Sequence, residues 1–141
     1  MDQIRSEHLE NHTNKTYQER MNQTALSKFG AITKHLGENV KLLDFGSGFS
    51  PEFIKQVTQT GTHYVAYDVS QIVQSQLQEN NIDFITKEQL ENAEDEFDII
   101  YMSSVFHELM SYLSRPERTK TLAMLDRALK PDGTIIIRDW G

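Results

Sequence analysis

Residues 40–51 read V-K-L-L-D-F-G-S-G-F-S-P, and this stretch decides the fold. An apolar run is followed by an acidic residue, two glycines that are two positions apart, and a helix start. Because glycine has no Cβ, Gly46 and Gly48 let the backbone turn sharply and approach a ligand closely. Ser50 suits the N-cap, and Pro51 suits the first helical position, where its missing N–H costs nothing. The stretch therefore predicts a strand, a glycine turn and a helix, the arrangement with which doubly wound α/β sheets bind nucleotide-like ligands.

A second acidic residue indicates that the ligand carries a ribose. Residues 63–68 read as a β-branched and aromatic strand that ends at Asp68, 22 positions after Gly46. In doubly wound folds, a carboxylate about 20 residues after the glycine turn reaches the ribose hydroxyls. A carboxylate suits this role because it can accept hydrogen bonds from both hydroxyls at once. The alternative is that Asp68 caps the helix expected at residues 71–79, a role that Ser70 can share.

The glycine spacing argues against a dinucleotide site, because Pro51 stands where the G-x-G-x-x-G/A fingerprint has its third glycine. The stretch instead resembles motif I of the class I S-adenosylmethionine (SAM)-dependent methyltransferases, written D/E-x-G-x-G. F-D-I-I-Y-M-S-S at residues 97–104 resembles their motif IV, and L-K-P-D-G-T-I-I-I at residues 129–137 resembles the segment before their fifth strand. Together with Asp68, these features occur in family order. The alternative for the glycines alone is a turn that needs them only for its geometry.

The resemblance implies a Rossmann-like, doubly wound, mostly parallel sheet in the order 3-2-1-4-5 with helices on both faces. The expected strands are residues 40–45, 63–68, 82–86, 97–104 and 134–139. The expected helices are residues 16–36 (one helix or a bent pair), 51–59, 71–79, 105–113 and 115–129. Residues 88–96 are expected to form a loop or one helical turn, and residues 130–133 a turn. We expect a polar N-terminal arm at residues 1–15 and one SAM-binding domain at residues 16–141.

SAM is the cofactor that the resemblance implies. The glycine turn is expected to contact its amino-acid and ribose parts, Asp44 to orient the turn or the cofactor ammonium, and Asp68 to hold the ribose. The full set of expected cofactor residues is Asp44, Gly46, Ser47, Gly48, Asp68, Val69 and Ser103. The usual adenine contact has no clean match; the resemblance nominates Glu88 or Gln89, and the alternative is that both are merely solvated.

His107 and Glu108 follow the fourth expected strand and are the candidate catalytic residues. An imidazole at this place could accept a proton from a hydroxyl or amine nucleophile. The alternative is that both side chains lie on the next helix and hydrogen-bond to neighbouring loops. The zinc motif H-E-x-x-H lacks its second histidine, because position 111 is serine, so we expect no metal.

The composition restricts the possible functions and partners of the protein. The 141 residues fit one domain, and without cysteine there is neither a disulfide framework nor a thiolate metal site. The polar N-terminus is no signal peptide, and no apolar run is long enough to span a membrane, so we expect a cytoplasmic protein. The net charge of −7 disfavours nucleic acid as a partner for this domain alone and favours a small-molecule or protein substrate.

The sequence thus predicts a domain that transfers a methyl group from SAM to an unidentified acceptor. The alternative is a SAM-binding domain of a larger protein, or a regulatory module, without independent catalysis. The family's C-terminal antiparallel hairpin has no counterpart after residues 134–139, which suggests truncation. We expect this edge to self-associate, to be covered by residues 1–15, or to leave the chain insoluble without a missing segment.

Overall fold

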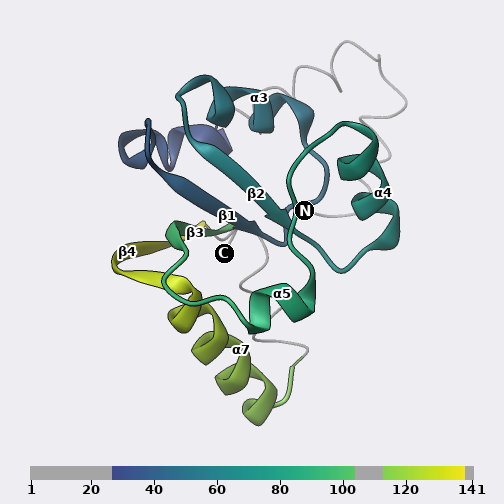
Figure 1. Cartoon of the computed structure of the whole chain (residues 1–141), viewed down its shortest axis with the longest axis vertical. Coiled ribbons are helices and arrows are strands. Elements are labelled where there is room, and N and C mark those ends of the chain that lie inside the picture. The colour runs from purple at the N-terminus through teal and green to yellow at the C-terminus, as the bar shows by residue number, and fades with distance from the viewer. Residues whose placement is uncertain (1–26, 104–112, 139–141) are drawn as a thin grey trace, which may run out of the picture.

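A parallel sheet of four strands organises the chain in the computed structural model, which describes residues 27–103 and 113–138 (Figure 1). The strands are β1 (Lys41–Phe45), β2 (His63–Tyr67), β3 (Phe97–Ser103) and β4 (Leu129–Arg138). They lie in the order β2-β1-β3-β4, and every neighbouring pair is parallel. β1 and β3 read as nearly continuous apolar runs because both faces of these central strands are covered.

Helices cover the two faces of the sheet and define two apolar clusters. Helices α3 (Pro51–Gln59) and α4 (Gln71–Glu79) contribute to a cluster with Leu42, Tyr64 and Tyr101. Helices α5 (Lys87–Glu91) and α7 (Arg115–Ala128) contribute to the cluster on the other face, with Leu43, Phe45 and Tyr67. Figure 1 shows α3 on one side of the sheet and α5 with α7 on the other. The predicted fold class is confirmed.

Local signals set where the helices begin. Ser70 accepts the Val73 N–H at the start of α4, as an N-cap should. Ser50 holds the N-cap position of α3, but its side chain makes no capping hydrogen bond; Pro51 and the acidic Glu52 in the first turn are the remaining start signals. Capping boxes open α5 at Thr86 and α7 at Ser114. The expectation of a loop or one helical turn at residues 88–96 holds in part: the short helix α5 begins one residue earlier, at Lys87, and its Leu90 packs in the core.

The expected strand at residues 82–86 is reduced to one bridge, and its predicted length is wrong. Phe84 pairs with Ala66 in parallel on the outer side of β2. Two hydrogen bonds hold it, from the Ala66 N–H to the Asp83 carbonyl and from the Ile85 N–H to the Ala66 carbonyl. The segment is too short for more pairing, because the C-cap of α4 is Asn80 and the α5 capping box already begins at Thr86. Its place beside β2 nevertheless preserves the predicted strand order.

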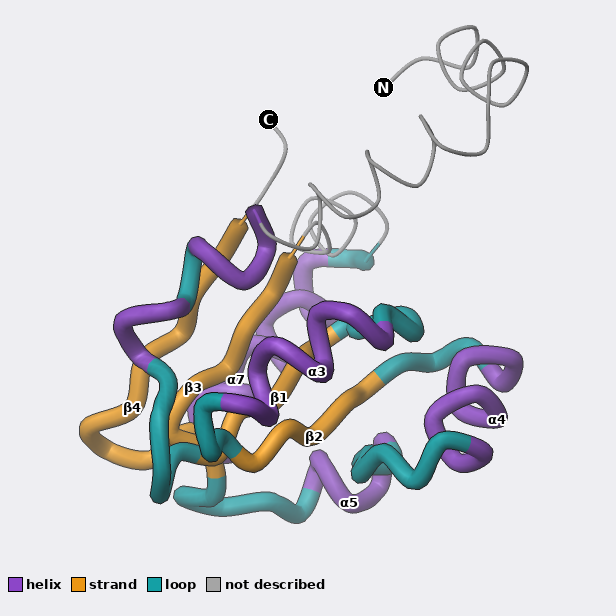
Figure 2. Tube along the Cα trace, turned by 90° about the horizontal axis from the view of Figure 1, so that it is seen from above, coloured by secondary structure: helices purple, strands orange, loops and turns teal. Residues whose placement is uncertain are grey.

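The expected turn at residues 130–133 is instead an irregular bulge inside β4. Leu129 pairs with Phe97 and Thr134 pairs with Ile99, so four residues bow outward between the two pairs (Figure 2). Asp98 holds the bulge, because its carboxylate accepts from the Lys41 N–H at 2.8 Å and lies 3.2 Å from the Lys130 ammonium. The strand therefore begins five residues earlier than predicted.

The expected helix at residues 16–36 is described only from residue 27. It is helical at residues 27–30, turns, and continues as the 3-10 helix η1 (Thr33–His35). Within this described part the helix is therefore bent, which was one of the two expectations. Ile32 between the two pieces is completely buried and anchors the bend on the α3 side of the sheet.

Candidate functional site

A pocket of about 1120 Å³ opens at the carboxyl ends of the strands. This is the edge at which doubly wound sheets bind ligands. Six of the seven residues predicted to bind the cofactor line it: Gly46, Ser47, Gly48, Asp68, Val69 and Ser103. The remaining described wall residues are Phe45, Tyr67, Lys87, Glu91, Leu113, Glu117, Lys120, Thr121, Ala123, Met124 and Arg127.

The glycine turn (residues 46–48) forms one wall of the pocket. Gly46 and Gly48 have φ angles of 77° and 59°, which side-chain-bearing residues rarely adopt. The N–H groups of Gly46 and Ser47 both donate to the Tyr67 carbonyl, at 2.8 and 3.1 Å. A Cβ placed on Gly48 would meet no atom within 4 Å, so this glycine faces open space that a ligand can approach.

Asp68 joins this turn to the end of β2. Its Oδ2 accepts the Gly48 N–H at 2.8 Å, and its Oδ1 accepts the Ser70 N–H at 2.9 Å. A carboxylate oxygen has two lone pairs, so each oxygen retains one for a ligand hydroxyl. The carboxylate is therefore held in place before any ligand binds. Ser70, and not Asp68, is the N-cap of α4, which leaves Asp68 available for the predicted ribose contact.

Tyr67 and residues of the helices α5 and α7 also line the pocket. The Tyr67 ring stacks on Phe45 with a centroid separation of 5.1 Å. Burial, with smaller contributions from Glu91 and Asp68, raises the pKa of the Tyr67 hydroxyl. Lys87 and Glu91 are the α5 residues at the pocket wall.

The residues nominated for the adenine contact, Glu88 and Gln89, are not among the described wall residues. Both are exposed on α5. The Gln89 side chain instead accepts the Thr86 N–H at 2.9 Å in the capping box. Helical geometry explains the difference, because positions 87 and 91 are four apart and share one face of α5.

Asp44 is the predicted cofactor residue that does not line the pocket. It belongs to β1 and is only 1% exposed. Tyr64, its partner in a hydrogen bond, packs in the apolar cluster on the α3 side of the sheet, whereas the pocket wall lies on the α5 side. Asp44 Oδ2 accepts from the Tyr64 hydroxyl at 2.6 Å, and burial followed by the Asp44 charge raises the Tyr64 pKa well above its usual value.

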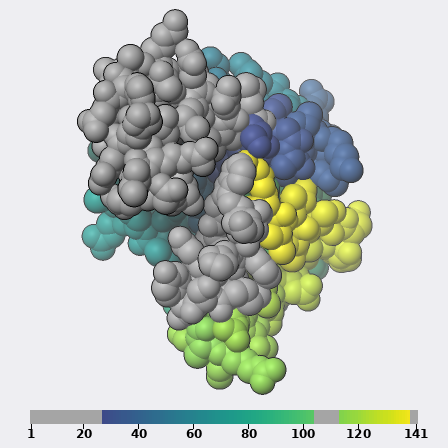
Figure 3. All heavy atoms as spheres, turned by 180° about the vertical axis from the view of Figure 1, so that it is seen from behind, coloured from purple at the N-terminus to yellow at the C-terminus, as the bar shows by residue number. Residues whose placement is uncertain are grey.

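Ser103 marks the end of β3 at the pocket. Its hydroxyl accepts from the Arg138 guanidinium at 3.1 Å, and the same guanidinium donates to the Ser27 hydroxyl at 3.0 Å. Arg138 thus ties the ends of β3 and β4 to the helical residues 27–30. In Figure 3 the blue-purple segment that begins at residue 27 lies against the yellow end of β4.

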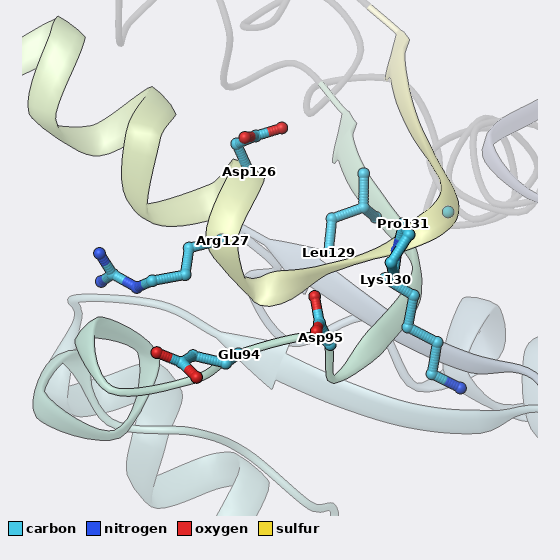
Figure 4. Close-up of a pocket in the computed structure, with 8 residues that line it drawn as sticks. Glu94, Asp95, Asp126, Arg127, Leu129, Lys130 and Pro131 are labelled. Atoms are coloured by element: carbon cyan, nitrogen blue, oxygen red, sulfur yellow. The ribbon is translucent and has the colours of Figure 1, made fainter.

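A second hollow, of about 680 Å³, lies at the opposite edge of the sheet beside the β4 bulge. Its wall includes Glu94, Asp95, Asp126, Arg127 and Lys130. Figure 4 shows that the side chains of Asp126, Arg127 and Lys130 point in different directions and do not converge on a common centre. We therefore assign the candidate site to the pocket at the carboxyl edge.

The candidate catalytic residues His107 and Glu108 lie outside the described residues. Within residues 27–103 and 113–138, no group of three or more His, Asp or Glu side chains is placed to hold a metal ion. The same part of the chain contains no helix with the length and apolar character needed to cross a membrane.

Comparison with known proteins establishes the family. A family model described as "Methyltransferase domain" matches residues 14–141. No protein with a curated description matches the chain significantly. The match to the family model covers most of the chain, and the chain therefore belongs to the methyltransferase domain family. The resemblance found in the sequence motifs is confirmed.

Solved structures share the fold. A TehB-like SAM-dependent methyltransferase from Corynebacterium glutamicum is 21% identical with a TM-score of 0.62, covering 90% of this chain and 75% of that chain. A SAM-dependent methyltransferase from Archaeoglobus fulgidus is 16% identical with a TM-score of 0.64, covering 82% of this chain and 51% of that chain. The glycopeptide N-methyltransferase MtfA in complex with sinefungin is 16% identical with a TM-score of 0.58, covering 80% and 52%. The chain thus spans between half and three quarters of these structures.

Proposed function

We propose that this domain binds SAM in the pocket at the carboxyl edge of the sheet and transfers its methyl group to an acceptor. One observation carries the proposal: Asp68 accepts the Gly48 N–H, so the candidate ribose ligand and the glycine turn form one prebuilt unit. Membership of the methyltransferase domain family supports the same reaction.

The residues present fit SAM. Asp68 retains acceptor capacity for two ribose hydroxyls, and Gly48 has open space where a side chain would otherwise stand. Asp44 lies outside the pocket wall, and its contact with the cofactor ammonium stays a prediction. A pocket of about 1120 Å³ also leaves room for an acceptor beside the cofactor.

When bound, SAM supplies a methyl group on a sulfonium, which is already activated for in-line displacement. The protein then contributes mainly positioning. The glycine turn and Asp68 would fix the cofactor, and Ser103 lies at the end of β3, where the resemblance to motif IV predicts that the acceptor arrives. His107 and Glu108 remain the predicted bases for an acceptor that must lose a proton.

Calorimetric titration tests the proposal directly. We expect SAM and its product S-adenosylhomocysteine each to bind the folded chain at one saturable site, and NAD to give no heat. Absence of heat with both SAM and S-adenosylhomocysteine at millimolar concentrations, with circular dichroism confirming the fold, would contradict it. The methyl acceptor can then be sought by measuring methyl release against metabolite pools and proteins.

The acceptor class and the location of the protein remain predictions. The acidic charge of −7 supports a small-molecule or protein acceptor over nucleic acid, because like charges repel the phosphate backbone. We retain the cytoplasm as the expected compartment. Incubating the chain with labelled SAM and either RNA or a protein extract distinguishes the acceptors by where the label appears.

A further inference from the structure

The ends of β3 and β4 form a hydrogen-bonded cluster beside the candidate pocket. Ser103 pairs with Arg138 in the sheet register, so both side chains lie on one face at neighbouring strand ends. The Arg138 guanidinium donates to the Ser103 hydroxyl at 3.1 Å and to the Ser27 hydroxyl at 3.0 Å. Ser103 lines the pocket, whereas Arg138 and Ser27 are not among its described wall residues. The cluster therefore connects the pocket wall to groups that lie behind it.

Tyr101 completes this cluster. It lies two positions before Ser103 on β3 and therefore shares its face of the sheet. Its hydroxyl donates to the Lys28 carbonyl at 2.8 Å, which uses the only hydrogen of the phenol. Burial raises the pKa of Tyr101, and the side-chain hydrogen bond with Ser103 and the Arg138 charge partly offset this. A hydrogen bond lowers the pKa of a phenol when the phenolic oxygen accepts, so Ser103 is the donor in this bond.

These contacts set the direction of the hydrogen bonds at Ser103. A serine hydroxyl has one hydrogen and two lone pairs. The hydrogen is directed to Tyr101, and one lone pair accepts from Arg138. One lone pair remains, so toward the pocket Ser103 can accept a hydrogen bond but has no hydrogen to donate. A ligand group that bonds to this oxygen must itself carry an N–H or an O–H.

We propose that Ser103 binds the methyl acceptor through a hydrogen on its nucleophilic atom, and that Arg138 is the positioning residue that keeps Ser103 in this accepting orientation. The inference rests on the proposed function and gives the acceptor a chemical class: a primary or secondary amine, or an alcohol. Such a nucleophile directs its lone pair at the methyl carbon while its hydrogen points to Ser103. A bond from nitrogen or oxygen to carbon forms, the carbon–sulfur bond breaks with its electron pair on sulfur, and the proton is released to water in the net reaction.

Arg138 suits the positioning role because its guanidinium stays charged and presents several donors in a fixed plane. It bonds to Ser103 and Ser27 at once, which holds it between β3 and the helical residues 27–30. Without it, the Ser103 hydroxyl could rotate and share its hydrogen between Tyr101 and the pocket. The acceptor would then lose a fixed partner, whereas the glycine turn and Asp68 would still hold the cofactor.

The identity of the methylated atom provides the first test. The full chain is incubated with methyl-labelled SAM and a fractionated cell extract, and mass spectrometry identifies the labelled product. We expect the label on a nitrogen or oxygen that carried a hydrogen before the reaction. Label on carbon, on sulfur or on a nitrogen without hydrogen overturns this inference while methyl transfer stands. Absence of any labelled product overturns the proposed function and the inference with it.

Kinetics with the identified acceptor, at saturating SAM, test the role of Arg138. We expect Arg138→Met to lower kcat/KM for the acceptor about tenfold, the size expected for one hydrogen bond to a charged group. Binding of S-adenosylhomocysteine, measured by calorimetry, should stay within about twofold. Arg138→Lys should restore part of the loss, because an ammonium can still donate to Ser103. Ser103→Ala should lower kcat/KM at least as much, and it tests the subsite where Arg138→Met fails to fold.

Arg115→Met is the matched control. Arg115 is exposed at the start of α7 and is not among the described wall residues, so its substitution should change neither kcat/KM nor the dissociation constant. Circular dichroism checks the fold of each variant. Unchanged turnover in Arg138→Met, or an equal loss of turnover and of S-adenosylhomocysteine affinity, overturns the positioning role. A loss confined to acceptor turnover in Arg138→Met and Ser103→Ala supports it.

Discussion

Asp68 is the residue on which the candidate site depends most, because its two oxygens already hold two backbone segments. We expect Asp68→Ala to weaken S-adenosylhomocysteine binding by about 2–4 kcal/mol, since it deletes a charge-assisted bidentate acceptor. Calorimetry measures the loss. Asp83→Ala is the control, because Asp83 is exposed and its side chain pairs with His63 at 2.7 Å, away from the pocket wall. Equal affinity of Asp68→Ala and the control would show that Asp68 does not contact the ligand.

At this scale the sequence reveals residues whose role depends on local spacing. Gly46, Gly48 and Asp68 could be predicted because a glycine turn and a strand-end acid stand at fixed offsets from one another. The ion pair between Lys28 and Asp44 could not be predicted, because the two residues are 16 positions apart in the sequence and a bent helix lies between them. Periodicity identifies Lys28 only as a polar position on an amphipathic helix. It carries no information on which strand end that position faces.

Among the elements, β4 differs most from what its sequence predicts, because it contains a bulge. Asp98 stabilises this bulge. We expect Asp98→Ala to lower the free energy of unfolding by about 1–3 kcal/mol, because the Lys41 N–H loses its acceptor and Lys130 loses its partner. Urea unfolding measures the change. Asp132→Ala, on the exposed crest of the same bulge, should leave the stability nearly unchanged. Similar losses in both variants would contradict this role for Asp98.

The capping box at the start of α7 should make the stability of the fold depend on pH. Hydrogen bonds from Ser114, first from its backbone N–H, lower the pKa of Glu117 below its ordinary value of 4.5. Because the pKa of Glu117 is lower in the folded state than in the unfolded state, its carboxylate stabilises the fold above pH 4.5. This stabilisation is lost as the pH falls through the folded-state pKa. Urea unfolding should therefore show a steeper loss below pH 4.5 in the wild type than in Glu117→Gln, which keeps the capping box. Parallel pH profiles would contradict the prediction.

Element boundaries show where sequence patterns are insufficient. The bounds of α3 and α4 agree with prediction because each has a start signal and a stop signal, such as Pro51 before α3 and Gly61 after it. The segment at residues 82–86 is apolar enough for a strand, yet it pairs at one residue only. Strand propensity alone cannot show that the capping box of α5 uses Thr86, the last residue of the expected strand. Tertiary pairing also draws Leu129 into β4 despite the turn signal that follows it.

Across the whole molecule, β4 lies at one edge of the sheet formed by the described residues. Ile135 and Ile136 pack against the two apolar clusters, whereas Ile137 is 46% exposed. Such an edge offers unpaired backbone groups to another strand. We expect the isolated 141-residue chain to self-associate through β4 and Ile137→Lys to reduce that association. Sedimentation velocity compares the two.

Amide exchange provides the second readout for this edge. Protection of residues 134–138 that increases with protein concentration would support pairing through β4. A chain that remains monomeric at high concentration, with these amides unprotected, would show that the edge needs no partner. Coverage of the edge by residues 1–15 predicts a monomer in which these amides are protected at every concentration.

The Tyr67 carbonyl, which receives the N–H groups of both Gly46 and Ser47, has a thermodynamic consequence. Together with the Gly48 N–H on Asp68, it secures three successive amides of the glycine turn, so the turn has little conformational entropy left to lose. Binding should then cost little ordering on the protein side, and ligand should change hydrogen exchange at these three amides only slightly. A site that is rigid before binding derives its selectivity from shape, since it cannot adapt to nucleosides of a different outline.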